Sequence, residues 1–88
     1  SVDESESASH DQEKYEQAVD MFRINVELFP ESWNVYDSLG EALYAKGELT
    51  EAEAMYVKSV ELNPESPTGE EALRQIRQDM SVNLSNGR

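Results

Sequence analysis

The feature that most constrains this chain is an internal repeat. Segment 48–66 (ELTEAEAMYVKSVELNPES) matches segment 14–32 (KYEQAVDMFRINVELFPES) at one fixed offset of 34 positions. The matched pairs are Ala18 with Ala52, Met21 with Met55, Phe22 with Tyr56, Val26 with Val60, Leu28 with Leu62, and Pro30 with Pro64. A period of this length indicates stacked helical hairpins, because a single hairpin cannot cover its own apolar face.

Four helices are predicted, over residues 11–28, 32–45, 50–62 and 68–80, and no segment has the alternating pattern of a strand. In each helix the apolar residues recur at steps of three and four, which places them on one face. A proline or a glycine follows each of the first three helices, and both residues commonly end helices. The expected fold class is therefore all-α.

Serine and threonine side chains mark the expected starts of these helices. Such a side chain accepts a hydrogen bond from the first turn, and a Glu or Gln three residues later completes a capping box. The expected caps are Ser9 with Gln12, Ser32, Thr50 with Glu53, and Thr68 with Glu71.

The two ends of the chain are polar. Residues 1–10 are acidic and nearly free of apolar side chains, so we expect a disordered tail there, and a second one over 81–88. The chain opens on Ser1 rather than on Met, which favours a fragment of a larger protein.

Charge limits the classes of partner. Nineteen acidic residues against seven basic ones give a formal net charge of −12. This balance argues against binding to nucleic acid or to an anionic membrane, which both need clustered Lys and Arg. A partner selected by charge is therefore expected to be a basic protein or peptide. The alternative is that the acidity serves solubility, as in a halophilic protein.

Few residues offer chemistry. The chain has no cysteine, and its one histidine, His10, lies in the expected N-terminal tail. Ser9, His10 and Asp11 are adjacent in sequence, so their side chains would point in different directions and could not form a catalytic triad. The acidic pairs lack the spacing of a calcium loop. We expect no enzyme, no metal and no cofactor, and, without an apolar run or a signal peptide, a cytoplasmic protein.

The stretch from Trp33 to Pro64 resembles a tetratricopeptide repeat. The residues that carry the resemblance are Tyr36, Leu39, Gly40, Leu43, Gly47, Ala52, Tyr56 and Pro64. Gly40 and Ala52 are small, so paired helices could approach closely there. The chain departs from the family pattern at Tyr36, where tryptophan is usual, and at Asn25 and Ser59, where alanine is usual. The resemblance implies a right-handed α-α superhelix made of half a repeat, one full repeat and a C-terminal capping helix.

In this family the first helix of each pair lines a concave groove that holds a partner segment. The resemblance thus implies a non-catalytic scaffold or adaptor module. The implied groove residues are Asn34, Asp37, Ser38, Glu41 and Tyr44, with Thr68, Glu71, Gln75 and Gln78 on the last helix. Asp37 and Glu41 would repel the carboxylate of a chaperone tail, whereas Lys or Arg would suit them, with Tyr44 available for a cation–π contact.

A weaker likeness suggests a different role. The segment ELFPESWNVYDSLGEALYAKGE is similar to repeat tails that follow bacterial serine-type hydrolase domains. The alternative function is therefore a structural appendage that packs against an attached domain. Tyr15 and Phe22 would then be buried against that neighbour.

Two apolar surfaces complete the candidate contacts. Trp33 either covers the joint with the preceding repeat or is an exposed anchor for a partner. The first helix lacks a preceding partner helix, so we expect an exposed face around Tyr15, Val19 and Phe22 and, with it, weak self-association.

Overall fold

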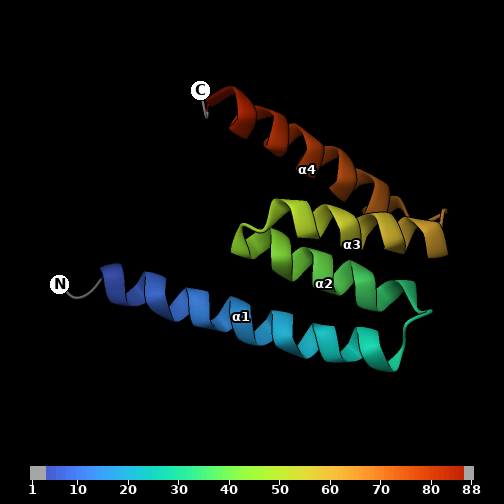
Figure 1. Cartoon of the computed structure of the whole chain (residues 1–88), viewed down its shortest axis with the longest axis horizontal. Coiled ribbons are helices and arrows are strands. Elements are labelled where there is room, and N and C mark those ends of the chain that lie inside the picture. The colour runs from blue at the N-terminus through green and yellow to red at the C-terminus, as the bar shows by residue number, and fades with distance from the viewer. Residues whose placement is uncertain (1–3, 87–88) are drawn as a thin grey trace.

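The computed structural model describes residues 4–86, and the side chains of residues 13–82 within them. The chain forms four helices, namely α1 (Glu4–Leu28), α2 (Trp33–Lys46), α3 (Leu49–Leu62) and α4 (Pro67–Asn86) (Figure 1). No strand occurs over residues 4–86. The prediction of an all-α fold is confirmed.

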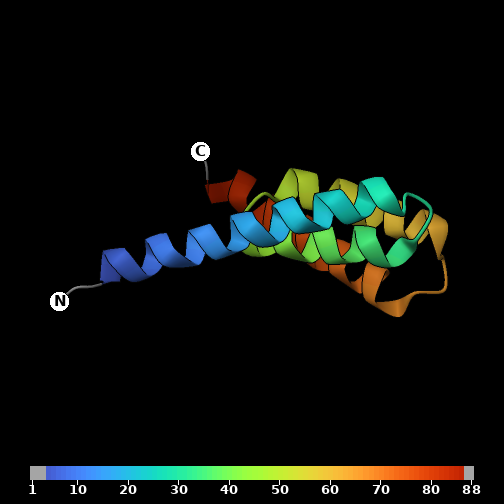
Figure 2. The same ribbon diagram turned by 90° about the horizontal axis from the view of Figure 1, so that it is seen from below.

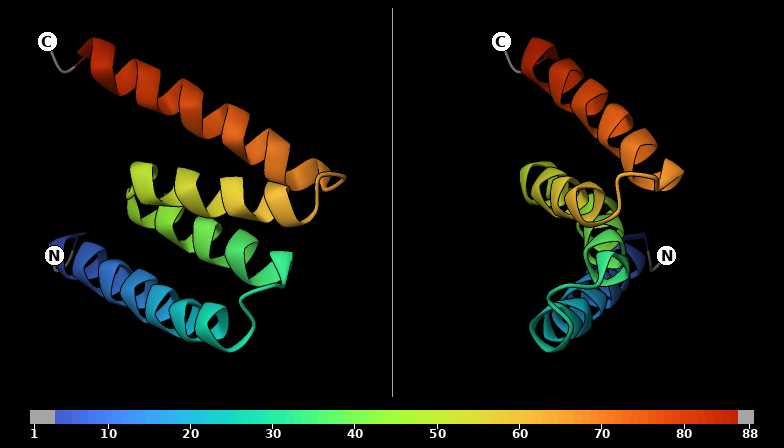
Figure 3. Two further views of the ribbon diagram at one scale, coloured as in Figure 1. Left: turned by 45° about the vertical axis from the view of Figure 1, so that its right-hand side comes forward. Right: turned by 90° about the vertical axis from the view of Figure 1, so that its right-hand side faces the viewer.

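Each helix runs antiparallel to the one before it and packs mainly against it (Figure 1). Seen edge-on, α1 and α3 lie in one layer and α2 and α4 in the other (Figures 2 and 3). The last helix, α4, starts beside the end of α3 and then diverges from it (Figure 1). This divergence leaves room between α2 and α4.

The helix ends in the middle of the chain lie close to the glycine and proline residues that predicted them. Gly47 has a left-handed backbone, with φ of 98°, and its N–H donates to the carbonyl of Tyr44. The N–H of Glu48 donates to the carbonyl of Leu43, which completes a Schellman motif. At the other end of α2, the Tyr36 hydroxyl donates to the Pro30 carbonyl over 2.7 Å and ties the helix to the turn before it.

The outer helix ends differ from the prediction. Residues 4–10 and 81–86, expected in disordered tails, are helical in the structure. Neither segment contains glycine or proline, so nothing in it interrupts the helix, and acidic side chains are favourable at a helix N-terminus. The rest of the expected tails, residues 1–3 and 87–88, lies outside the described residues.

Three of the predicted caps are wrong. Ser9, Thr50 and Thr68 all lie inside helices, because α1 starts upstream and because α3 and α4 each start one residue earlier than expected. Ser32 does hold the N-cap position of α2, with an extended backbone, but its side chain makes no capping bond. The residue that caps α4 is Ser66, whose Oγ accepts the N–H of Gly69 over 3.4 Å.

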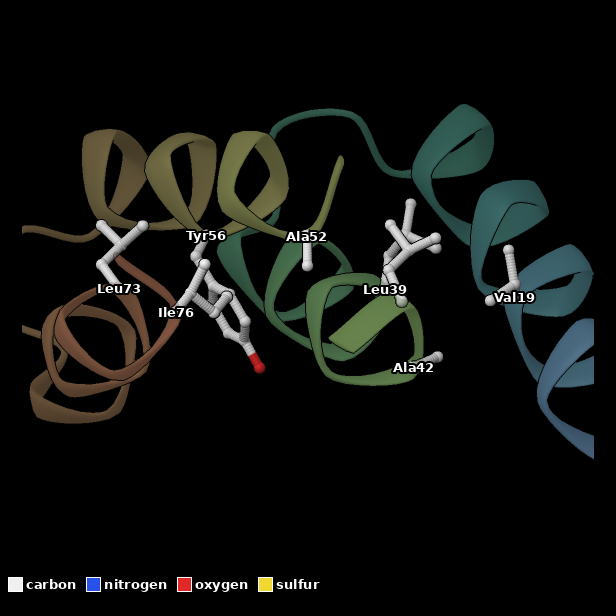
Figure 4. Packing of buried hydrophobic residues seen from close by; sticks show 8 residues of the cluster. Val19, Leu39, Ala42, Ala52, Tyr56, Leu73 and Ile76 are labelled. Carbon is white, nitrogen blue, oxygen red and sulfur yellow. The ribbon is translucent and has the colours of Figure 1, made fainter. Parts of the chain in front are cut away.

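A continuous core joins the four helices. Its buried residues are Val19, Leu39, Ala42, Leu43, Ala52, Tyr56, Leu73 and Ile76 (Figure 4). Gly40 permits the closest helix contact, since a Cβ there would lie 2.9 Å from Cε2 of Tyr56. Gly69 does the same for α4, where a Cβ would lie 2.8 Å from Cγ2 of Val60. The contact at Gly40 agrees with the prediction that this small residue lets the paired helices approach closely.

Ion pairs on the surface connect α3 to α1 and to α4. Arg23 Nη1 lies 2.6 Å from Glu51 Oε2, and Arg77 Nε lies 2.9 Å from Glu53 Oε2. Hydrogen bonding to Arg23 lowers the pKa of Glu51, against a smaller opposing effect of burial. Both pairs are partly exposed, so each contributes at most about 1 kcal/mol. Among the described residues, no helix has the length and apolar character needed to cross a membrane.

Candidate functional site

A pocket of about 510 Å³ opens between α2 and α4. Its lining residues come from three helices: Asp37, Glu41 and Tyr44 of α2, Tyr56 of α3, and Thr68, Glu71, Ala72, Gln75 and Ile76 of α4. We call this site the acidic pocket. Most of its polar lining belongs to the groove implied by the sequence.

Helix periodicity explains why these residues meet. Asp37, Glu41 and Tyr44 are spaced at i, i+4 and i+7, so they share one face of α2. Glu71 and Gln75 are spaced at i and i+4 on α4 in the same way. The capped first turn of α4 and its close contact with α3 then hold this face opposite α2.

The pocket is strongly anionic. Three carboxylates, those of Asp37, Glu41 and Glu71, line it, and among the side chains of residues 13–82 no Lys or Arg does. Burial raises the pKa of Asp37, and the nearby charge of Glu41 raises it further. The two carboxylates therefore oppose each other in an environment that is already partly desolvated. A cation between them would relieve both effects.

Two of the lining residues, Tyr44 and Gln75, are hydrogen-bonded to the same carboxylate. The Tyr44 hydroxyl donates to Oδ2 of Asp79, and Gln75 Nε2 donates to Oδ1 of the same carboxylate over 3.1 Å. The bond to Asp79 is the main cause of the raised pKa of Tyr44. Because its hydroxyl is already engaged, Tyr44 offers its ring rather than its O–H to a ligand.

Tyr56 lies at the bottom of the pocket. Its side chain is only 6% exposed and lies beside Ile76, with its hydroxyl directed away from the α3 backbone (Figure 4). Within the part of the chain that the structure describes, this hydroxyl makes no hydrogen bond. Burial, followed by the charges of Asp37 and Glu41, raises its pKa, so it stays protonated and remains a hydrogen-bonding group for a ligand.

Sequence reasoning missed three of the lining residues as parts of a site. Tyr56 was expected to fill the space between helices, and Ala72 and Ile76 were expected as apolar positions of the last helix. The available signal was their spacing, because Ala72 and Ile76 flank Gln75 on the same side of α4. That signal does not tell a core position from a pocket wall.

Other predicted site residues do not line the acidic pocket. Asn34 and Gln78 are exposed, and Ser38 is half-buried on α2. Trp33 is half-buried at the first position of α2. This exposure lies between the burial expected at a joint with a preceding repeat and the exposure expected of an anchor for a partner.

The prediction that the first helix exposes its apolar face is wrong for Val19 and Phe22. Val19 is 3% exposed, and Phe22 is half-buried and packed against the core. This side of α1 contacts α2, so of these three residues Tyr15 alone is exposed, at 37%. The large apolar side chains that α1 does expose lie on its opposite side.

The arrangement can hold a positively charged group. Aromatic rings, an unpaired phenol and several carboxylates suit an ammonium or guanidinium group. Within residues 13–82, no group of three or more His, Cys, Asp or Glu side chains is placed to bind a metal ion. Comparison with family models, with curated proteins and with solved structures gives no match for this chain.

Proposed function

We propose that the chain is a non-catalytic interaction module that binds a basic segment of another protein in the acidic pocket. The observation that carries the proposal is the lining itself. Asp37, Glu41 and Glu71 line one hollow that no Lys or Arg of the described part of the chain lines. A Lys or Arg side chain entering it would neutralise carboxylates whose mutual repulsion already disfavours the empty site.

The rest of the lining suits the same ligand. The ring of Tyr44 can stack against a guanidinium group or lie beside an ammonium group. The Tyr56 hydroxyl can accept a hydrogen bond from either. The apolar wall at Ala72 and Ile76 suits the methylene stem that carries the charge.

We further propose that the module is of the tetratricopeptide type. The repeat offset and the antiparallel helix order support this assignment. So does the contact between Gly40 and Tyr56, where a small residue of one helix receives a large one of the next. In such a module the acidic pocket belongs to the concave surface, and the superhelix is right-handed.

The test is a binding titration with short synthetic peptides. A fluorescent peptide with Lys and Arg should bind, the same peptide with Glu in their place should not, and added salt should weaken binding. Glu41→Gln and Glu71→Gln change exposed residues, so the fold should be kept while the affinity falls. A loss of about threefold to tenfold is expected for each.

Glu61→Gln is the matched control, because Glu61 is exposed on α3 and does not line the pocket. It should bind the basic peptide as the parent chain does. Equal capture of the acidic peptide, or an equal loss in all three variants, would reject the proposal.

A further inference from the structure

Helix α1 carries apolar side chains on two opposite sides. One side, with Val19, packs on α2. The other side exposes Met21 at 60%, Ile24 at 54% and Leu28 at 64%, and Phe29 continues it past the helix end at 57%. With 3.6 residues per turn, Met21, Ile24 and Leu28 fall on one line along α1. We call these three residues and Phe29 the outer stripe.

The internal repeat indicates what this side of α1 is suited to hold. At the repeat offset, Met21 and Leu28 of the outer stripe correspond to Met55 and Leu62 of α3. Unlike α1, α3 has a helix on each side, and its Ala52 points toward α2 (Figures 1 and 4).

Each of these α1 residues is more exposed than its counterpart. Met55 is half-buried and packed against the core whereas Met21 is 60% exposed, and Leu62 is 36% exposed against 64% for Leu28. Met21 and Leu28 therefore leave exposed an apolar surface that their counterparts partly bury in α3, and Ile24, which stands where α3 has the exposed Lys58, extends this surface.

The charges beside the outer stripe restrict the occupant. Glu13, Asp20 and Glu27 recur at every seventh position, so they form a row along one border of the stripe, and all three are exposed. The nearest basic residue of the same segment, Arg23, is paired with Glu51. Next to the end of the stripe, a hollow of about 490 Å³ is lined by Phe29, Pro30, Glu31 and Ser32.

We propose that the outer stripe docks an amphipathic α-helix that lies antiparallel to α1, with basic residues along one border. Its apolar side would cover Met21, Ile24 and Leu28, and its Lys or Arg residues would face Asp20 and Glu27. A large side chain near its end would enter the hollow at Phe29. This site lies on α1 and its following turn, so it is separate from the acidic pocket and does not depend on the function proposed for it.

A second copy of the chain is a poorer occupant. In an antiparallel pair of α1 helices, the acidic rows of the two copies would face each other. Each copy also carries a formal net charge of −12, which opposes association.

The test uses two synthetic amphipathic helices with the same leucine stripe. One is bordered by lysines and the other by glutamates, and each is titrated against the full 88-residue chain. The lysine-bordered helix should bind at least about tenfold more tightly. The double variant Met21→Ser/Ile24→Ser should weaken that binding about tenfold or more, because both side chains are exposed and their loss leaves the core intact.

Two further variants make the test specific. Asp20→Lys/Glu27→Lys should reverse the preference toward the glutamate-bordered helix. Glu71→Gln, which changes the acidic pocket, should leave helix binding unchanged, so failure at one site can be told from failure at the other. Equal affinity for the two helices, or no effect of the serine variant, would overturn the proposal. So would a dimer in sedimentation equilibrium that Met21→Ser/Ile24→Ser dissociates.

Discussion

The ring of Tyr56 lies directly against the backbone of Gly40, where a Cβ would be 2.9 Å from Cε2 and 3.0 Å from Cδ2. The same ring also lines the acidic pocket. One contact therefore fixes both the distance between α2 and α3 and the position of a pocket residue.

Gly40→Ala should destabilise the chain by about 1–2 kcal/mol. Overpacking costs about 1–3 kcal/mol, and alanine recovers up to about 1 kcal/mol through its helix propensity. Urea unfolding followed by circular dichroism measures the change. In a Tyr56→Leu background the same substitution should cost clearly less, because the ring that it meets is gone. Equal costs in both backgrounds would show that the ring is not the obstacle.

Ser66→Ala should destabilise the chain by about 1 kcal/mol, since Ser66 accepts the N–H of Gly69 in the first turn of α4. Thr68→Ala, at the position that the sequence favoured as the cap, should cost less. Thermal unfolding of the two variants under the same conditions decides between them. If Thr68→Ala lost more stability than Ser66→Ala, Thr68 rather than Ser66 would be the cap.

Ser59→Ala should stabilise the chain by about 1 kcal/mol. Ser59 is fully buried, and its Oγ has no hydrogen-bond partner among the described residues. Alanine removes that unpaired hydroxyl while leaving almost no cavity. Ser81→Ala, at an exposed position of α4, serves as the control and should be neutral. An unchanged or lower melting temperature for Ser59→Ala would contradict the prediction.

Asp37→Asn should raise the melting temperature at neutral pH and weaken binding of the basic peptide. The pKa of Asp37 is raised, first by burial and then by Glu41, so the folded state binds the proton more tightly than the unfolded chain does. For the parent chain, this group therefore adds stability as the pH falls through the raised pKa, and reduces it at neutral pH.

The measurement is the difference in melting temperature between Asp37→Asn and the parent chain, from neutral pH to about pH 4. The difference should be largest at neutral pH and shrink on acidification. Glu61→Gln, at an exposed position that does not line the pocket, should give a difference that changes little. A difference for Asp37→Asn that grows in acid would refute the sign of the pKa shift.

Much of the fold was predictable because its signals are local. A left-handed glycine at Gly47 and the prolines at 30 and 64 mark where helices end, whatever the rest of the chain does. Residues 4–10 and 81–86 contain no glycine or proline, and their polar composition led the prediction to end the outer helices too early. The caps failed for a related reason. A serine or threonine caps a helix only from the position just before the first helical residue. Ser66 rather than Thr68 occupies that position in α4.

The site was predictable in part. The groove implied by the family resemblance included Asp37, Glu41 and Glu71, which line the pocket, but it also included Asn34 and Gln78, which lie off it. Whether a residue on a groove-facing helix reaches the hollow depends on how far α4 diverges, and no local pattern records that angle. The prediction of which side of α1 is exposed was wrong because both sides are apolar. Periodicity alone could not tell which of them contacts α2.

The serial packing of α1 to α4 also bears on how the molecule folds. Because each helix rests chiefly on its neighbour in sequence, the chain closes only short loops as it assembles, and rapid folding is the expected result. The same arrangement lets the ends open while the central pair α2 and α3 stays formed, so amide exchange should be fastest at the two termini and slowest around Leu39 and Leu43.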